Sequence, residues 1–161
     1  MDIKTWTILC ACIIVAAVLL SGCIGQKTQT EVQPEPPAVL VTYERTGGIA
    51  GLDDRLVIFD NGAGLLTSRS GSTEISLTKL DMARINALFS EAQFSMLQTS
   101  YSASHTNAGL VTYSVSYHGK TVTVQDSAIP PSFQPVLNEL DRFVNSASNQ
   151  MTNYSIVNVK I

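Results

Sequence analysis

The sequence predicts an α+β fold: an antiparallel β-sheet of roughly five to seven strands, with two amphipathic helices packed on one face. Two observations lead to this prediction. Short segments in which apolar and polar residues alternate, as in half-buried strands, are separated by turns that contain glycine. Two longer segments instead carry apolar residues three and four positions apart, which is the spacing of one helix face.

The first four expected strands precede the first helix. Val39–Glu44 alternates between apolar and polar positions, and Leu56–Phe59 is a short apolar run that suits a strand buried on both faces. Leu65–Arg69 and Ser72–Leu77 follow as two further strands, joined by a turn at Ser70-Gly71.

The first helix is expected from Leu80 to about Ala92. The segment from Thr78 to Asp81 resembles a capping box in which Asp takes the place of Glu, so the Thr side chain would cap the N-terminus of the helix. Phe94–Leu97 is expected to be a short packed extension. Thr99–Gly109 is rich in Ser, Thr, Asn and Ala, which is typical of an exposed loop.

The clearest alternation in the chain follows that loop. In Val111–Tyr117 the valines and tyrosines are expected to face inward and the Ser and Thr residues outward. Thr121–Gln125 alternates in the same way. His118-Gly119 would close the two strands into a hairpin, because His is among the few residues besides glycine that tolerate positive φ.

A second helix and a tail complete the expected domain. Ser132 is expected to be the N-cap of a helix whose apolar face runs from Phe133 to Val144. Residues 145–161 are expected to form a polar tail, with a final strand at Tyr154–Ile161.

The N-terminus has the features of an exported lipoprotein. Lys4 supplies a basic residue, and an uncharged apolar run from Ile8 to Leu20 has about the length of a signal-peptide core. Leu20-Ser21-Gly22-Cys23 then resembles the lipobox of prokaryotic lipoproteins, in which the cysteine thiol is joined to a diacylglycerol and the peptide before it is removed. The alternative is an uncleaved N-terminal membrane helix, in which Cys23 has no special role.

The lipobox resemblance, together with the composition and periodicity of the rest of the chain, divides the chain into four expected regions. Residues 1–22 are the signal peptide, residues 23–38 are the lipidated Cys23 with a disordered tether rich in Pro, Gln and Thr, residues 39–144 are the folded domain, and residues 145–161 are the tail. The two acyl chains would hold the protein stably on the cell membrane, with the domain facing the outside.

Composition and motifs narrow the classes of function. The net charge of −3 gives too little positive charge to bind nucleic acid by neutralising phosphates. Cys10 and Cys12 lie in the predicted signal peptide, so processing would leave one cysteine, with no disulfide and no thiolate metal site. His105 and His118 are not part of a zinc, phosphate-binding or nucleophile motif. We therefore expect no metal, no cofactor and no catalytic residue.

One stretch of sequence is more specific. Tyr43–Leu52 reads Tyr-Glu-Arg-Thr-Gly-Gly-Ile-Ala-Gly-Leu and resembles the emfourin family of proteinaceous metalloprotease inhibitors, which typically has a strand, then Arg-Ser-Gly-Gly-Phe-Ala-Gly and an aliphatic residue. The first helix, the alternating hairpin and the acidic-then-Pro segment Asp126–Pro131 follow in the order of the family. The resemblance covers about Val39 to Val144. This chain departs from the family in having Ile49 where Phe is usual, and in an additional turn-and-strand segment at Asn61–Ser76.

The resemblance implies a function, since family members inhibit thermolysin-like zinc proteases. A loop would occlude the active-site cleft of the protease, with glycines that let the backbone come close to another surface and an apolar anchor at the centre. The residues expected to contact the partner are Gly47, Gly48, Ile49, Ala50, Gly51 and Leu52. Two alternatives remain open: that the glycines only make a wide hairpin, and that the chain is a non-inhibitory binding or structural lipoprotein of the cell envelope. An enzyme is a distant third.

Overall fold

The computed structural model describes residues 35–105 and 109–158. The chain divides into two compact units, Met1–Glu35 and Pro36–Ile161, and the helices and strands described here belong to the second. The predicted signal peptide at residues 1–22, Cys23 and the tether as far as residue 34 lie outside the described residues.

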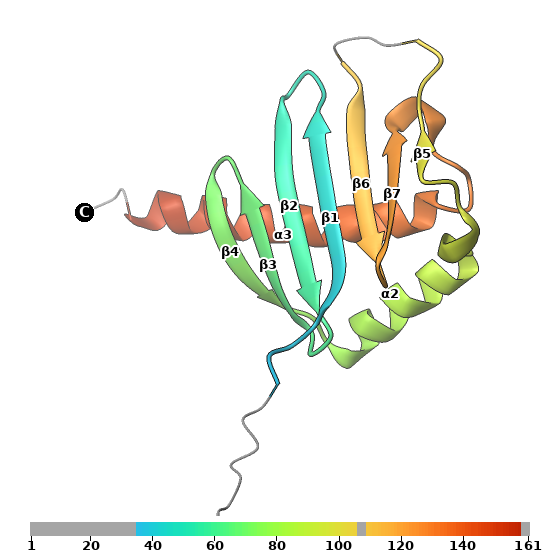
Figure 1. Cartoon of the computed structure of the whole chain (residues 1–161). Coiled ribbons are helices and arrows are strands. Elements are labelled where there is room, and N and C mark those ends of the chain that lie inside the picture. Colours follow the sequence, from blue (N-terminus) through green and yellow to red (C-terminus); the bar gives the residue numbers. More distant parts are fainter. Residues whose placement is uncertain (1–34, 106–108, 159–161) are drawn as a thin grey trace, which may run out of the picture. The chain divides into compact units, whose positions relative to one another are not determined.

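Seven strands form one sheet in the order β4-β3-β2-β1-β6-β7-β5, and two long helices cover one of its faces (Figure 1). The α+β class is therefore confirmed, with helices packed on the sheet. The strands are β1 Val39–Gly47, β2 Leu52–Phe59, β3 Ala63–Ser68, β4 Gly71–Ser76, β5 Ser100–Tyr101, β6 Val111–Tyr117 and β7 Lys120–Gln125. The helices are α2 Lys79–Glu91 and α3 Gln134–Asn158, with two short 3₁₀ turns, η1 Phe94–Met96 and η2 Asp126–Ala128.

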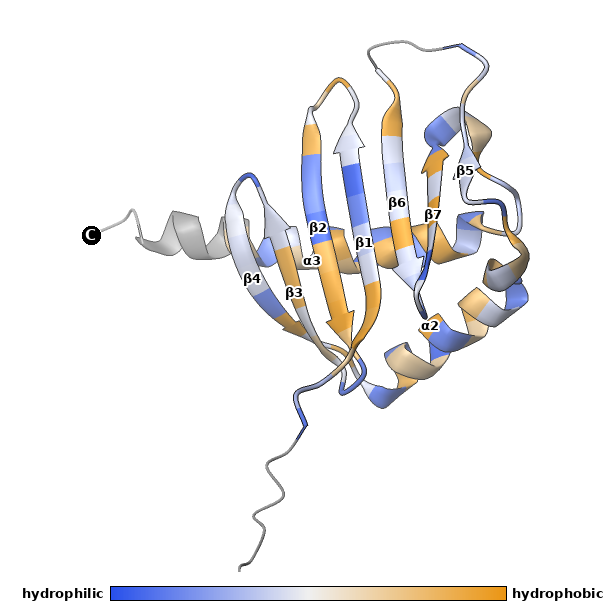
Figure 2. Cartoon of the chain, viewed as in Figure 1, coloured by the Kyte–Doolittle hydropathy of each residue, from blue (hydrophilic) through white to orange (hydrophobic). Residues whose placement is uncertain are grey.

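The side chains between the sheet and the helices form one apolar core. Val41 and Tyr43 of the central strand β1 are fully buried and lie in register with buried residues of β2 and β6 on the same face. Apolar and polar residues alternate along the strands (Figure 2), which is the pattern that predicted them. The core consists of Val41, Tyr43, Leu56, Ile58, Leu66, Leu77, Ile85, Phe89, Ala92, Phe94, Val115, Val122, Val124, Phe133, Val136, Leu137, Leu140, Phe143, Val144 and Ala147.

The N-terminus of α2 is capped as the sequence predicts. The Thr78 hydroxyl accepts a hydrogen bond from the Asp81 backbone N–H at 3.1 Å, and the Asp81 carboxylate accepts one from the Thr78 backbone N–H at 3.0 Å. Hydrogen bonds from the Thr78 hydroxyl and backbone N–H hold the pKa of Asp81 below its usual value. Asp is therefore long enough to close the reciprocal pair that Glu usually makes.

The sheet is mixed, and the expectation of a purely antiparallel sheet was wrong at one edge. β5 pairs in parallel with β7, with Ser100 opposite Thr123 and Tyr101 opposite Val124. β5 lies in the segment expected to be an exposed loop. Its strand conformation depends on pairing with β7, because two residues are too few to show an alternating pattern of their own.

The second helix is longer than expected, and the predicted final strand at Tyr154–Ile161 was wrong where the structure describes it. α3 runs without a break to Asn158. The reason lies in the helical spacing of Phe143, Ala147 and Met151, which continue the core-facing side of α3 beyond Val144. Over the described part of the chain, no helix combines the length and the apolar character needed to cross a membrane.

A matched pair of leucines tests the assignment of the core. Leu140 of α3 is 1% exposed and Leu80 of α2 is 79% exposed. We expect Leu140→Ala to lower the free energy of unfolding by about 2–5 kcal/mol, because it leaves a cavity under the sheet. Leu80→Ala should change it by no more than about 0.5 kcal/mol. Urea denaturation of both variants measures the difference, and equal effects would contradict the packing of α3 on the sheet.

Candidate functional site

The predicted partner-binding residues form the tight turn between β1 and β2. Gly47 ends β1 and pairs with Leu52, which begins β2. Gly47, Gly48 and Gly51 have φ angles of +89°, +71° and +61°. Glycine is the residue that adopts such angles without strain, so all three glycines are required by the path of the backbone.

The backbone of this turn is fixed by close contacts. The Gly48 N–H donates to the carbonyl oxygen of Leu110 at 3.0 Å, and the Gly51 N–H donates to the carbonyl oxygen of Gly48 at 3.0 Å. A Cβ atom on Gly47 would lie 2.8 Å from the carbonyl oxygen of Leu110. The turn is therefore held both within itself and against the residue that precedes β6.

The side chain at the tip of the turn faces solvent. Ile49 is 97% exposed, and Ala50 beside it is exposed as well. Leu52 is half-buried at the start of β2. We call residues 47–52 the glycine loop; it presents Ile49 and Ala50 outward on a backbone that the three glycines shape.

A polar network at the base of the glycine loop joins the hairpin to α3. Arg45 and Asp54 are cross-strand neighbours, and the Arg45 Nε donates to the Asp54 carboxylate at 2.7 Å. The same guanidinium donates to Asp141 of α3 at 2.9 Å and to the Asn145 side-chain oxygen at 3.1 Å. The Tyr43 hydroxyl also donates to Asp141, at 2.7 Å.

Burial and charge perturb two groups of this network. Burial and the negative charge of Asp141 raise the pKa of the Tyr43 hydroxyl well above its usual value, so it remains a hydrogen-bond donor. Burial opposes the charge of Arg45, but its hydrogen bond to Asp54 and the charge of Asp141 raise its pKa. Tyr43 and Arg45 therefore both remain protonated donors to the carboxylates of this network.

Sequence reasoning identified the glycine loop but not the network that supports it. Arg45 and Asp141 are separated by 96 positions in the sequence, and neither belongs to a motif. One signal was available: Arg45 continues the inward-facing series of Val41 and Tyr43, and a charged residue in a core-facing position requires a partner.

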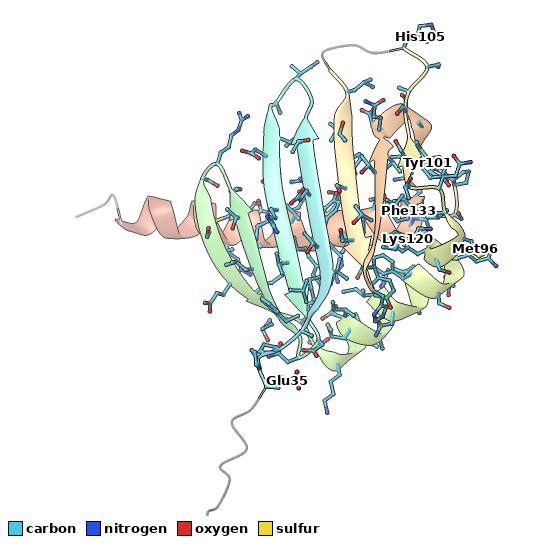
Figure 3. All side chains as sticks on the ribbon, viewed as in Figure 1. Glu35, Met96, Tyr101, His105, Lys120 and Phe133 are labelled. Atoms are coloured by element: carbon cyan, nitrogen blue, oxygen red, sulfur yellow. The ribbon has the colours of Figure 1, made fainter. Side chains whose placement is uncertain are left out.

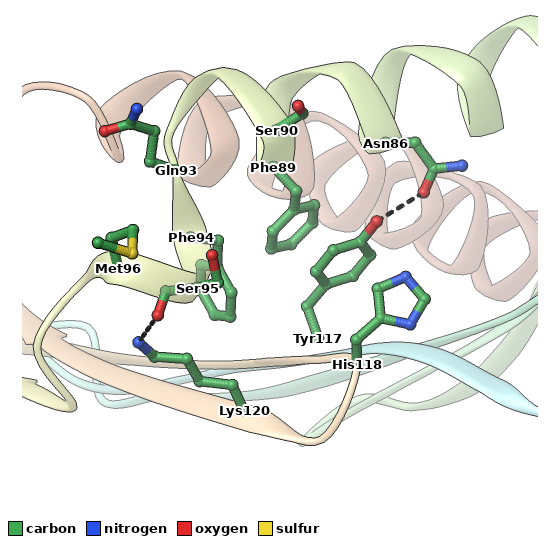
Figure 4. A pocket seen from close by; sticks show the side chains of 10 residues that line it. All are labelled: Asn86, Phe89, Ser90, Gln93, Phe94, Ser95, Met96, Tyr117, His118 and Lys120. Atoms are coloured by element: carbon green, nitrogen blue, oxygen red, sulfur yellow. Dashed lines mark hydrogen bonds between the residues drawn. The ribbon is translucent and has the colours of Figure 1, made fainter.

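A separate cavity of about 440 Å³ lies between the end of α2, η1 and the β6–β7 hairpin. Phe89 and Tyr117 stack in it with ring centroids 4.0 Å apart, and the Tyr117 hydroxyl donates to Asn86 at 3.0 Å (Figure 4). The Lys120 ammonium donates to the backbone carbonyl of Ser95 at 2.7 Å and to that of Leu97. The cavity is lined by Asn86, Phe89, Ser90, Gln93, Phe94, Ser95, Met96, Tyr117, His118 and Lys120.

The polar groups of this cavity are largely engaged in holding the fold together. The Lys120 ammonium closes η1 onto β7, and Tyr117 ties β6 to α2. The lining residues include no carboxylate that could act as a base beside His118. The cavity therefore lies where hydrogen bonds fasten α2 and η1 to the β6–β7 hairpin. It is a weaker candidate for a binding site than the glycine loop.

The two histidines lie apart from the glycine loop and from each other. His118 and Gly119 have φ angles of +46° and +79° and form the predicted turn between β6 and β7. His105 lies in the segment between β5 and β6 (Figure 3). Within residues 35–105 and 109–158, no group of three or more His, Cys, Asp or Glu side chains is placed to hold a metal ion.

Comparison of the sequence with protein-family models and with curated proteins finds no match.

The close contact at Gly47 gives a test of the loop geometry. Gly47→Ala places a Cβ at positive φ and against the Leu110 carbonyl, whereas Gly119→Ala meets nothing within 4 Å at a similar φ. We expect Gly119→Ala to cost about 1–2 kcal/mol of unfolding free energy from strain alone. Gly47→Ala should cost clearly more, because the carbonyl cannot move away without disturbing β6. Chemical denaturation compares them; equal costs would show that the turn is not held against Leu110.

Proposed function

We propose that the chain is a lipid-anchored protein on the outer side of the cell membrane, whose folded unit binds a partner protein through the glycine loop. We further propose that the partner is a thermolysin-like metalloprotease and that the loop occludes its active-site cleft. The observation that carries this proposal is Ile49, a large apolar side chain that is 97% exposed at the tip of a turn with a fixed backbone.

Exposure alone does not identify a binding site, because single apolar residues are common on protein surfaces. Ile49 differs from such residues because hydrogen bonds fix the backbone of the turn that carries it. Burial of such a side chain in a partner's pocket contributes about 1.5–3 kcal/mol. Little of this gain is lost to ordering the loop, because hydrogen bonds and three glycines already define its backbone.

The surroundings of the glycine loop provide further contact area. Leu110 of the segment before β6 and Arg69 of the β3–β4 turn lie against Gly47 and Gly51 respectively. A typical protease–inhibitor contact covers about 800 Å² on each partner. In this proposal the neighbouring loops supply the rim of the contact, and Ile49 and Ala50 form its centre.

The resemblance of Tyr43–Leu52 to the emfourin family suggests the class of partner. In this proposal no residue of the chain performs chemistry: the loop fills a cleft that the protease needs for its substrate. A second candidate function keeps the same loop and changes the partner. The chain would then be a non-inhibitory binding or structural lipoprotein, and the loop would hold a component of the cell envelope.

The inhibition hypothesis is tested by substitution at the tip of the loop. We expect the full-length chain to inhibit a thermolysin-like protease, and Ile49→Asp to raise the inhibition constant about 100-fold, because a charge would enter an apolar pocket. Ile49→Val should retain most of the inhibition. The readout is the rate of peptide cleavage as a function of inhibitor concentration.

Met96→Asp is the matched control, because Met96 is 80% exposed but lies in η1 (Figure 3), which is bonded to β7 and does not belong to the β1–β2 turn. It should inhibit like the unaltered chain. Equal inhibition by the Ile49→Asp and Met96→Asp chains would exclude the loop as the site. Absence of inhibition across several such proteases, combined with capture of a non-protease by the unaltered chain but not by its Ile49→Asp variant, would favour the second candidate.

The lipid anchor is tested at Cys23. We expect mass spectrometry of the mature protein to find a diacylated cysteine at its N-terminus, and Cys23→Ser to abolish this product, because a hydroxyl does not replace the thiol as the lipid acceptor. The variant should retain its signal peptide. Recovery of an unmodified N-terminal Met1 from the unaltered chain would contradict the anchor.

A further inference from the structure

The two edges of the sheet differ in how they end. At one edge β5 is only two residues long. At the other edge β4 spans six residues, Gly71–Ser76, and no described strand pairs with its outer side. Proteins usually protect a free edge with proline, lysine, a bulge or a very short strand. β4 has the sequence Gly-Ser-Thr-Glu-Ile-Ser, which contains no proline or lysine, and Glu74 is its one charged side chain.

The hydrogen-bonding direction of β4 follows from its pairing with β3. The Leu77 N–H donates to the Gly62 carbonyl at 2.8 Å, and the register continues from there with Ile75 opposite Gly64. In an antiparallel pair, the residues that bond to the neighbour alternate with residues whose N–H and C=O point away from it. The backbone groups that point to the open side are therefore those of Ser72, Glu74 and Ser76.

A groove lies beside this open edge. A cavity of about 280 Å³ is lined by β4, by α3 and by the adjoining residues. α3 does not stop below the edge: it continues from Gln150, which lines the groove, to Asn158, and Figure 1 shows it extending past β4. Eight residues of helix add about 12 Å, which is the width of two strands spaced at about 4.8 Å.

We propose that β4 and α3 form a second binding site, in which an extended segment of another protein adds to β4 as an eighth strand. The free N–H and C=O groups of Ser72, Glu74 and Ser76 would bond its backbone, and α3 would support it from below. This mode of recognition needs an exposed sheet edge and a neighbouring surface for alternate side chains, and both are present here. The site is independent of the glycine loop and of the function proposed for it.

The charged side chains beside β4 indicate which kind of segment would bind there. Arg142 is paired with Asp81 at 3.0 Å and with Glu139 at 2.7 Å, so the helix side of the groove is neutralised. Glu74 forms no ion pair or side-chain hydrogen bond with any described residue. A basic residue directly opposite Glu74 would complete the pair. Residues on either side of it would face the groove, where Phe143 and Ala147 are buried and the lining is mainly polar, with Ser146 and Gln150 of α3; this favours small polar side chains.

A second copy of this chain does not satisfy these requirements. In a two-fold antiparallel pair with the helices on one side, outward-facing residues of β4 oppose one another. Glu74 would then face Ser72, Ser76 or the Glu74 of the other copy, and none of these is basic. The partner is therefore a heterologous segment with a basic residue opposite Glu74 and small polar residues on either side of it.

The probe is a peptide labelled with fluorescein at its N-terminus, fluorescein-Val-Thr-Lys-Thr-Val-Thr-amide, with a counterpart in which Glu replaces Lys. We expect saturable binding of the Lys peptide to the full-length chain in detergent, measured by fluorescence anisotropy. Glu74→Lys should weaken binding of the Lys peptide about tenfold and reverse the preference in favour of the Glu peptide. Ser72→Pro should weaken both peptides, because it removes an outward N–H and no backbone bond to β3; of the bonds to β3 it removes the side-chain one from the Ser72 hydroxyl to Thr67.

Glu44→Lys is the control for the change of charge, on the same sheet face but on the interior strand β1, where Glu44 is paired with Arg55 at 3.5 Å, and it should leave the affinities unchanged. Three outcomes would overturn the proposal: no saturable binding at peptide concentrations up to about 1 mM, equal effects of the Glu74→Lys and Glu44→Lys changes, or a doubling of the mass in solution that Ser72→Pro abolishes. The last outcome would assign the edge to a second copy of the chain.

Discussion

The ends of β1 and β2 that carry the glycine loop depend on the guanidinium of Arg45, which bonds them to α3. It lies between Asp54 of β2 and Asp141 of α3, at the level where the inward-facing residues of β1 change from apolar to charged. On one side of Arg45 the sheet and α3 are joined by apolar packing, and on the other side, toward the glycine loop, none of the described helices lies behind the hairpin (Figure 1). A charge taken out of water must be fully paired, and here both carboxylates and the Asn145 side chain supply the partners. The network therefore fixes the base of the glycine loop to α3 by hydrogen bonds and ion pairs.

Local patterns predicted most of the fold because they report burial directly. The alternation in Val111–Tyr117 and the glycine-containing turns gave the hairpins, and Thr78 with Asp81 gave the start of α2. The errors have one physical origin, which is that pairing with distant residues overrides local composition. Ser100–Tyr101 reads as a loop but becomes a strand against β7. The segment after Val144 reads as a polar tail, yet Ala147 and Met151 keep it on the core as helix.

In the candidate site, too, local sequence predicted one part, and contacts between distant residues determine the other. Three glycines within five residues predicted a turn of unusual backbone, and φ angles from +61° to +89° account for them. The exposed position of Ile49 follows from its place at the tip of that turn. The supporting contacts were not predictable, because Arg45 meets Asp141 across 96 positions of sequence and Gly48 meets Leu110 across the sheet. Sequence reasoning thus located the surface of the site, and only the assembled fold explains why that surface is held in one shape.

The position of β1 has a mechanical consequence. The chain enters the folded unit at Val39, and β1 then runs for nine residues, about 30 Å, through the middle of the sheet between β2 and β6. The ladder bonds lie perpendicular to the strands. A pulling force transmitted through the N-terminal segment is therefore applied along β1, where it shears the ladders on both sides together instead of opening one bond after another. The glycine loop lies at the other end of this strand, so a force applied at Val39 is spread over the hydrogen bonds to β2 and β6 before it reaches the turn.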